Sequence, residues 1–156
     1  MDVRALALRA TSIVRARCIA EGSRTDAGSV STFTTFETVE RWKGAATPQF
    51  TIRLPGGEAA GLSVRVEGAP RFSPGEEAVL FLAITRSGDV TILTWAQGTF
   101  RIRMNPRAGV EEVSQDTGGL RLLDPRSSGA AAGGRQSLPL SALRQQVARA
   151  LSERRP

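Results

Sequence analysis

The residues with the clearest potential for chemistry are arginines that alternate with apolar residues. Arg15 and Arg17 form one such pair, and Arg101 and Arg103 form another. Residues two apart on a β-strand project from the same face, so each pair is expected to point out of a sheet. If the two strands are neighbours, the four guanidinium groups would form a patch suited to phosphate or carboxylate groups.

Groups that commonly carry out catalysis are scarce in this sequence. The chain contains no histidine, so it lacks the usual general base and the commonest zinc ligand. Cys18 is the single cysteine, and its alternating apolar surroundings predict an inert buried thiol. Lys43, the single lysine, stands at a Lys-Gly turn that is expected to leave it solvated and charged. We therefore predict no catalytic residues, no metal ligands, no cofactor and no enzymatic activity.

The paired carboxylates are weak candidates for a catalytic site. Glu76-Glu77 and Glu111-Glu112 are adjacent in sequence, and neighbours on a strand face opposite ways. The glycine-rich segment 55–61 lacks the Gly-Lys-Ser/Thr ending of a phosphate-binding loop. An enzyme with a site of carboxylates and arginines is therefore the third functional hypothesis, and it requires a pocket in which an acid is buried beside an arginine.

Exposed aromatic side chains would favour binding of single-stranded nucleic acid, because bases stack on them. Phe33 and Trp42 are the aromatic residues whose positions predict an outward orientation. The candidate partner-binding residues are Arg15, Arg17, Arg101, Arg103, Phe33 and Trp42. The net charge of +6 would attract phosphate or acidic surfaces in a salt-dependent way.

The elements that must position these residues are mostly strands. Period-two alternation and turn residues predict strands at about 12–20, 30–42, 50–54, 62–66, 78–83, 90–95, 99–103 and 110–113. Alternation slips within 30–42, which predicts a β-bulge. A polar turn is expected at 21–28. Residues 78–83 form a continuous apolar run, typical of a strand buried on both faces.

Short helices are expected at both ends of the chain. The first covers residues 2–10 with Asp2 as N-cap, and the second covers 141–153 with Ser141 as N-cap. The predicted fold class is mainly β: a small OB-like Greek-key barrel with a short N-terminal helix and a C-terminal helix. The predicted domains are a barrel with the first helix at 1–115, a Gly/Ala/Ser-rich linker at 116–137, and an amphipathic helix at 138–156 packed on the barrel.

Five segments carry a family resemblance. They are VERWKG at 39–44, PGG at 55–57, GAPRF at 68–72, PGEE at 74–77 and AQGTF at 96–100. Together they resemble an uncharacterised family of bacterial proteins, small and usually secreted, whose OB-like barrel is similar to netrin-like domains. The resemblance covers about residues 12–104 and implies a secreted or periplasmic protein. The chain differs from the family in beginning without the apolar core of a signal peptide, and from animal netrin-like domains in lacking a disulfide.

These observations lead to one functional prediction and to one alternative that ranks above the enzyme hypothesis. The prediction is a non-enzymatic binding module, exported in its native context, whose partner is a protein or an envelope polymer. The alternative is a cytoplasmic OB-type protein that binds single-stranded nucleic acid. No apolar run reaches the roughly 20 residues that a membrane span requires, so no span is expected.

Overall fold

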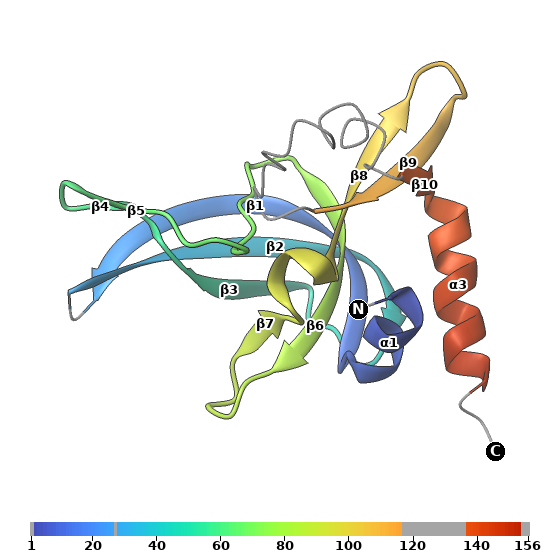
Figure 1. The fold of residues 1–156 in the computed structure, drawn as a ribbon, viewed down its shortest axis with the longest axis horizontal. Helices are drawn as coiled ribbons and strands as arrows, with labels where there is room; N and C mark the ends of the chain where they lie inside the picture. The colour runs from blue at the N-terminus through green and yellow to red at the C-terminus, as the bar shows by residue number, and fades with distance from the viewer. Residues whose placement is uncertain (1, 27, 117–136, 154–156) are drawn as a thin grey trace, which may run out of the picture.

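A computed structural model describes residues 2–26, 28–116 and 137–153 of the chain. Most of the linker predicted at 116–137 therefore lies outside the described residues. The elements, drawn in Figure 1, are α1 (Val3–Arg9), β1 (Ser12–Asp26), β2 (Ser29–Lys43), β3 (Gln49–Pro55), β4 (Gly57–Ala59), β5 (Leu62–Val64), β6 (Glu77–Ile84), β7 (Val90–Ile92), the 3-10 helix η1 (Trp95–Gly98), β8 (Thr99–Asn105), β9 (Val110–Gln115), β10 (Ser137–Pro139) and α3 (Leu140–Glu153). Neither described α-helix has the length and hydropathy needed to cross a bilayer.

One large antiparallel sheet dominates the structure. Its hydrogen-bonded order is β10-β9-β8-β6-β1-β2-β3, with β7 paired to β6, while β4 and β5 form a separate two-stranded sheet. The predicted mainly β class, with a short N-terminal helix and a C-terminal helix, is confirmed. The sheet is not a closed barrel, however, because its end strands β3 and β10 do not pair. Side-chain packing, and not strand pairing, connects β3 to β7, since Ile52 of β3 and Ile92 of β7 belong to the same buried cluster.

The β1–β2 hairpin is the longest pair of strands. Three shifts interrupt its register: Trp42 and Val39 are the extra residues on β2, and Ile19 is the extra residue on β1. The bulge predicted within 30–42 is therefore confirmed. The turn predicted at 21–28 is wrong over most of its length, because β1 continues to Asp26. Polar residues extend the strand there because pairing with β2 satisfies their backbone groups.

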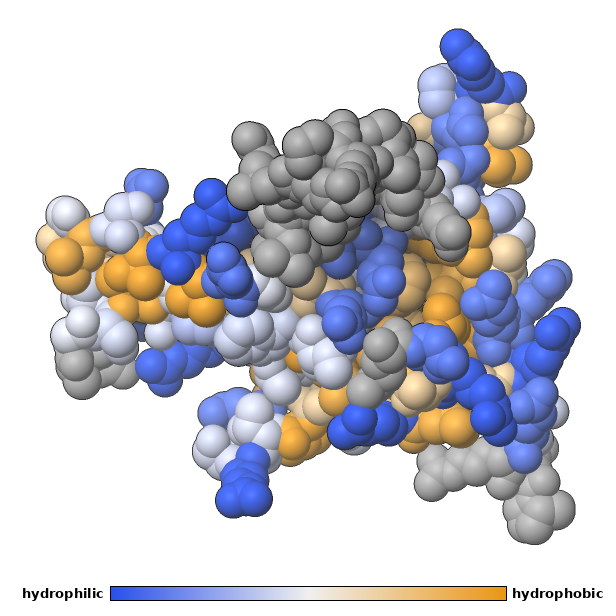
Figure 2. Space-filling view, in the orientation of Figure 1, coloured by the Kyte–Doolittle hydropathy of each residue, from blue (hydrophilic) through white to orange (hydrophobic). Residues whose placement is uncertain are grey.

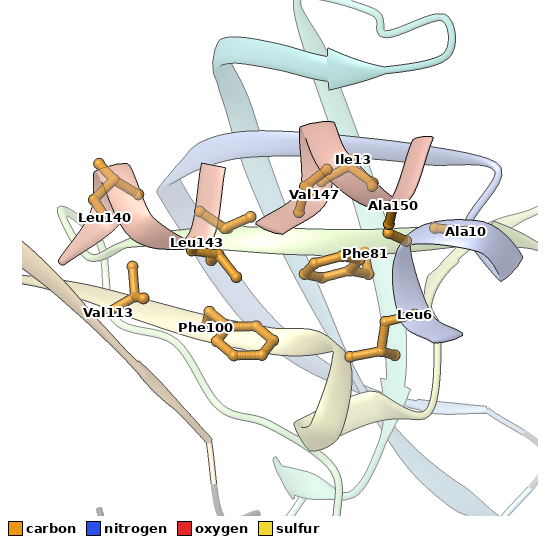
Figure 3. Close-up of a cluster of buried hydrophobic side chains, with 12 residues drawn as sticks. Leu6, Ala10, Ile13, Phe81, Phe100, Val113, Leu140, Leu143, Val147 and Ala150 are labelled. Carbon is orange, nitrogen blue, oxygen red and sulfur yellow. The ribbon is translucent and has the colours of Figure 1, made fainter. Parts of the chain in front are cut away.

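Two buried clusters lie on opposite faces of the sheet. The first, under the two helices, contains Phe81 and Phe100 from the sheet and Leu143 from α3 (Figure 3). The second contains Phe36 and Leu80 on the other face. β6 contributes to both clusters, since alternate residues of a strand face opposite ways. The predicted burial of segment 78–83 on both faces is thus confirmed for Ala78 through Leu82.

Both ends of α1 are capped by side chains. The Ala5 amide donates to Asp2 Oδ1 over 2.8 Å, so the predicted N-cap is confirmed. At the other end, Lys43 Nζ donates to the carbonyls of Ala7 (2.8 Å) and Ala10 (2.6 Å). The prediction of a solvated Lys43 is therefore wrong: the ammonium group satisfies carbonyls that the helix leaves unpaired.

Three other predicted boundaries differ from the structure. α3 begins at Leu140, so Ser141 lies within the first turn of the helix and is not its N-cap. The strand predicted at 90–95 ends at Ile92, because Thr94 and Trp95 adopt a φ of +53° and lead into η1. The glycine-rich segment 55–61, between the strands predicted at 50–54 and 62–66, contains a further strand, β4, which pairs with β5 through a two-residue turn.

Candidate functional site

The register of the sheet separates the two predicted arginine pairs. Directly opposed residues of antiparallel strands share a face. Arg15 lies opposite Val79 of β6, which belongs to the cluster under the helices. Arg101 of β8 lies opposite Ala78, which belongs to the cluster on the other face. β6 also lies between the two strands. The four guanidinium groups therefore do not form one patch.

The arginines of β1 are paired with acids. Arg15 Nε donates to Glu77 over 2.9 Å, and its terminal nitrogens donate to both carboxylate oxygens of Glu111 over 3.2 and 2.7 Å. Burial acts to lower the pKa of Arg15, but the hydrogen bonds to Glu111 and Glu77 outweigh it and raise the pKa above its ordinary value. Arg17, which is more exposed, binds Glu37 over 2.9 Å. These contacts connect strands, so Arg15 is a structural residue.

Arg101 is also held by several acceptors. It donates to Asp116 over 2.6 and 2.9 Å, to Glu76 over 2.8 Å and to the Arg71 carbonyl, and its guanidinium lies 4.7 Å from the centre of the Phe72 ring. Glu76, which precedes β6, and Glu77, the first residue of β6, thus each bind a different arginine. Arg103 is exposed and contacts no acid among the described residues.

Phe33, which the sequence predicted to face outward, lies on β2. Its ring is half-buried, with the Arg24 guanidinium 4.0 Å from its centre and that of Arg53 5.9 Å away. Gly22 lies opposite Phe33 in the register, so no side chain from that position covers the ring. Arg24 contacts no carboxylate among the described residues. The Arg24 guanidinium and the Phe33 ring thus form a cation–π pair.

Trp42 is part of the joint between the sheet and α3. Its Nε1 donates to Glu40 over 3.0 Å, and Arg144 of α3 lies 5.3 Å from the ring centre while donating to the same glutamate over 2.9 Å. The ring also packs against the cluster under the helices. Trp42 therefore stabilises the helix–sheet contact and is not available as a stacking surface.

The described residues offer little for covalent or metal chemistry. Cys18 is buried, and this burial raises the pKa of its thiol above the ordinary value. A thiol that is both buried and protonated is a poor nucleophile, which agrees with the inert role predicted for it. Within residues 2–26, 28–116 and 137–153, no three acidic or cysteine side chains gather so that they could hold a metal ion.

The structure has a projecting arm that the sequence did not predict. We define the arm as residues 20–26 of β1 and 28–35 in and before β2, together with residues 56–66 around β4 and β5, which extend away from the helices (Figure 1). Apolar side chains gather over the β4–β5 hairpin (Figure 2). Leu62 is 49% exposed and Val64 is 39% exposed.

Specific contacts join the β4–β5 hairpin to the β1–β2 ribbon within the arm. The Gly56 amide donates to the Val30 carbonyl over 2.8 Å, and Thr32 Oγ1 donates to the Gly56 carbonyl over 2.7 Å. A Cβ atom on Gly57 would lie 2.3 Å from Ser23 Oγ and 2.4 Å from Thr32 Oγ1. Glycine is thus required for the hairpin to approach the β1–β2 ribbon this closely, and the arm is a preformed surface.

No family model, curated protein or solved structure matches this chain.

A cleft opens between the arm and the body of the sheet. It encloses about 390 Å³ and is lined by Ser63–Val66 on one side and by Ala69–Arg71 on another, with Arg101 and Asp116 beside them. The sequence indicated a strand at 62–66 but not its exposure. The short Ala60-Gly61 turn could have predicted this exposure, because a hairpin of three-residue strands cannot bury its own apolar side chains.

Proposed function

We propose that this protein is a non-enzymatic binding module that holds a partner protein on the arm. The observation that carries the proposal is the contrast between the two ends of the molecule. At the body, Arg15 and Arg101 are each neutralised by two acidic side chains. On the arm, exposed Leu62 and Val64 lie beside Arg65, which contacts no acid among the described residues. An exposed apolar patch marks a site of interaction with another protein or a membrane, and arginine is enriched at protein interfaces.

Site-specific photo-crosslinking tests this proposal. A photoreactive amino acid placed at Leu62 should capture a defined partner in cells of the source organism. The same amino acid at Ile84, which is 51% exposed on β6, is the control and should capture little. A second experiment places the photoreactive amino acid at position 65. There the double substitution Leu62→Ser and Val64→Ser should lower the yield of the crosslinked adduct by about fivefold or more. Equal adducts from Leu62 and Ile84, or none from either, would show that the arm is not the binding surface.

We also propose that the module acts outside the cytoplasm. This part depends on the resemblance to a family of usually secreted bacterial proteins. Fractionation of the source organism checks it directly, because the full native product should be found in the envelope or the medium. Recovery in the cytosol alone would contradict export and leave the arm as the binding surface of a cytosolic protein.

Binding of single-stranded nucleic acid is a second candidate function, supported by Arg24 over Phe33. Such a site would stack a base on the ring and contact a phosphate through the guanidinium. Phe33→Leu should then weaken binding of a fluorescent oligonucleotide at low salt by about tenfold, because one stacked base contributes roughly 1–3 kcal/mol. Arg86→Gln, on an exposed turn distant in sequence, is the control. No binding at low salt would exclude this function.

A further inference from the structure

The outer edge of β5 is an open strand edge. β5 pairs with β4, and no other strand pairs with it among the residues that the structure describes. Ala59 and Leu62 close the two-residue turn, and hydrogen-bonded pairs alternate along an antiparallel ladder. The backbone N–H and C=O of Ser63 therefore point away from β4. Such an edge can accept another strand.

Residues of β5, Ser63 and Val64, line the cleft. Ser63, Arg65 and Val66 line one side of it, and Pro70 and Arg71 line another. An extended segment placed in the cleft would thus meet backbone groups of β5 and side chains from the 69–71 segment. Addition of a strand to an exposed edge is an established way in which proteins bind extended peptides.

The side chains of the cleft favour an acidic occupant. Arg65 contacts no acid among the described residues. Arg71 donates to Thr32 Oγ1 over 3.2 Å and to Glu21 Oε1 over 3.4 Å, and its side chain is 48% exposed. Asp116 is bound by Arg101 over 2.6 Å, and Glu58 of the lining has no ion-pair partner among the described residues. Guanidinium groups bind carboxylates through two parallel hydrogen bonds, so Arg65 is available to an acidic side chain and Arg71 can bind a second one beside Glu21.

We infer that the cleft binds an extended, acidic polypeptide segment of the partner, which adds as a strand to the outer edge of β5. The segment would exchange backbone hydrogen bonds with Ser63 and place carboxylates at Arg65 and Arg71. This inference rests on the proposed function, because it specifies the chemistry of the partner that the arm holds. In this arrangement the arginines select an acidic segment, and backbone hydrogen bonds with β5 supply the affinity.

Synthetic peptides test the inference on the full chain. The probe is a fluorescent eight-residue peptide in which glutamate alternates with valine, compared with the matching lysine–valine peptide. The glutamate peptide should bind at low salt at least about tenfold more tightly, since a charge-assisted hydrogen bond contributes roughly 1.5–3 kcal/mol. A third peptide, N-methylated at alternate residues so that one edge cannot donate, should bind weakly. Equal binding of all three peptides would overturn the inference.

Variants then locate the site. Arg65→Gln and Arg71→Gln should each weaken binding of the glutamate peptide by about tenfold, and Glu58→Gln should strengthen it, whereas Arg86→Gln should leave it unchanged. Loss of binding in Arg86→Gln, or no effect at either Arg65 or Arg71, would contradict the cleft as the site. If the glutamate peptide fails to bind while the Leu62 crosslink succeeds, the inference is wrong and the proposed function stands. If the Leu62 crosslink fails, the proposed function is wrong.

Discussion

Leu143→Ala is expected to lower the free energy of unfolding by about 2–5 kcal/mol, the cost of removing a buried leucine and leaving a cavity. Leu143 has no exposed surface and lies in the cluster under the helices, close to Phe100 and Val113 of the sheet (Figure 3). The four buried residues of α3 are its contribution to this cluster: Leu140, Leu143, Val147 and Ala150. Because short helices are stabilised mainly by such packing, α3 should detach more readily in the variant.

Urea denaturation followed by circular dichroism measures this loss. Leu62→Ala is the matched control, since it removes the same atoms from a side chain that is 49% exposed on the arm. It should change the free energy of unfolding by less than about 1 kcal/mol. Equal losses for the two variants would mean that α3 does not share a cooperative core with the sheet.

The sequence predicted the parts of the fold that repeat regularly. Strands buried on one or both faces, such as segment 78–83 in β6, show an alternating or continuous apolar pattern that reflects burial directly. The N-cap of α1 was predicted for a similar reason, because Asp2 makes a contact three residues away. Local signals of this kind are sufficient when the structure that they specify is also local.

The parts that the sequence did not predict depend on contacts between distant residues. Arg15 was proposed as a partner-binding residue, yet it binds Glu111, which is 96 positions away in sequence. Lys43 was expected in solvent, yet it caps α1 from 33 to 36 positions away. Whether an outward charge faces solvent or another charge depends on the strand order, which alternation does not encode. The exposure of Leu62 on the arm likewise depends on how distant strands are arranged, which alternation does not encode.

Arg15→Met is expected to lower the free energy of unfolding by about 2–3 kcal/mol. Breaking a buried ion pair costs roughly 3–5 kcal/mol because the remaining charge is left unpaired, and partial exposure reduces this. The side chain of Arg15 is 15% exposed, while those of Glu77 and Glu111 are 24% and 36% exposed. Methionine keeps most of the apolar stem of the arginine, so the loss should come mainly from two carboxylates without their shared cation.

A control on the same strand separates this effect from the general cost of removing a strand arginine. The raised pKa of Arg15 means that its contribution is fully present below the unfolded-state pKa, and so through the neutral range in which the variants are compared. Arg17→Met removes an arginine that is 45% exposed and has one acidic partner, and it should cost less than about 1 kcal/mol. Equal losses in Arg15→Met and Arg17→Met, measured by urea denaturation at neutral pH, would assign the effect to packing on the strand and not to the two acidic partners of Arg15.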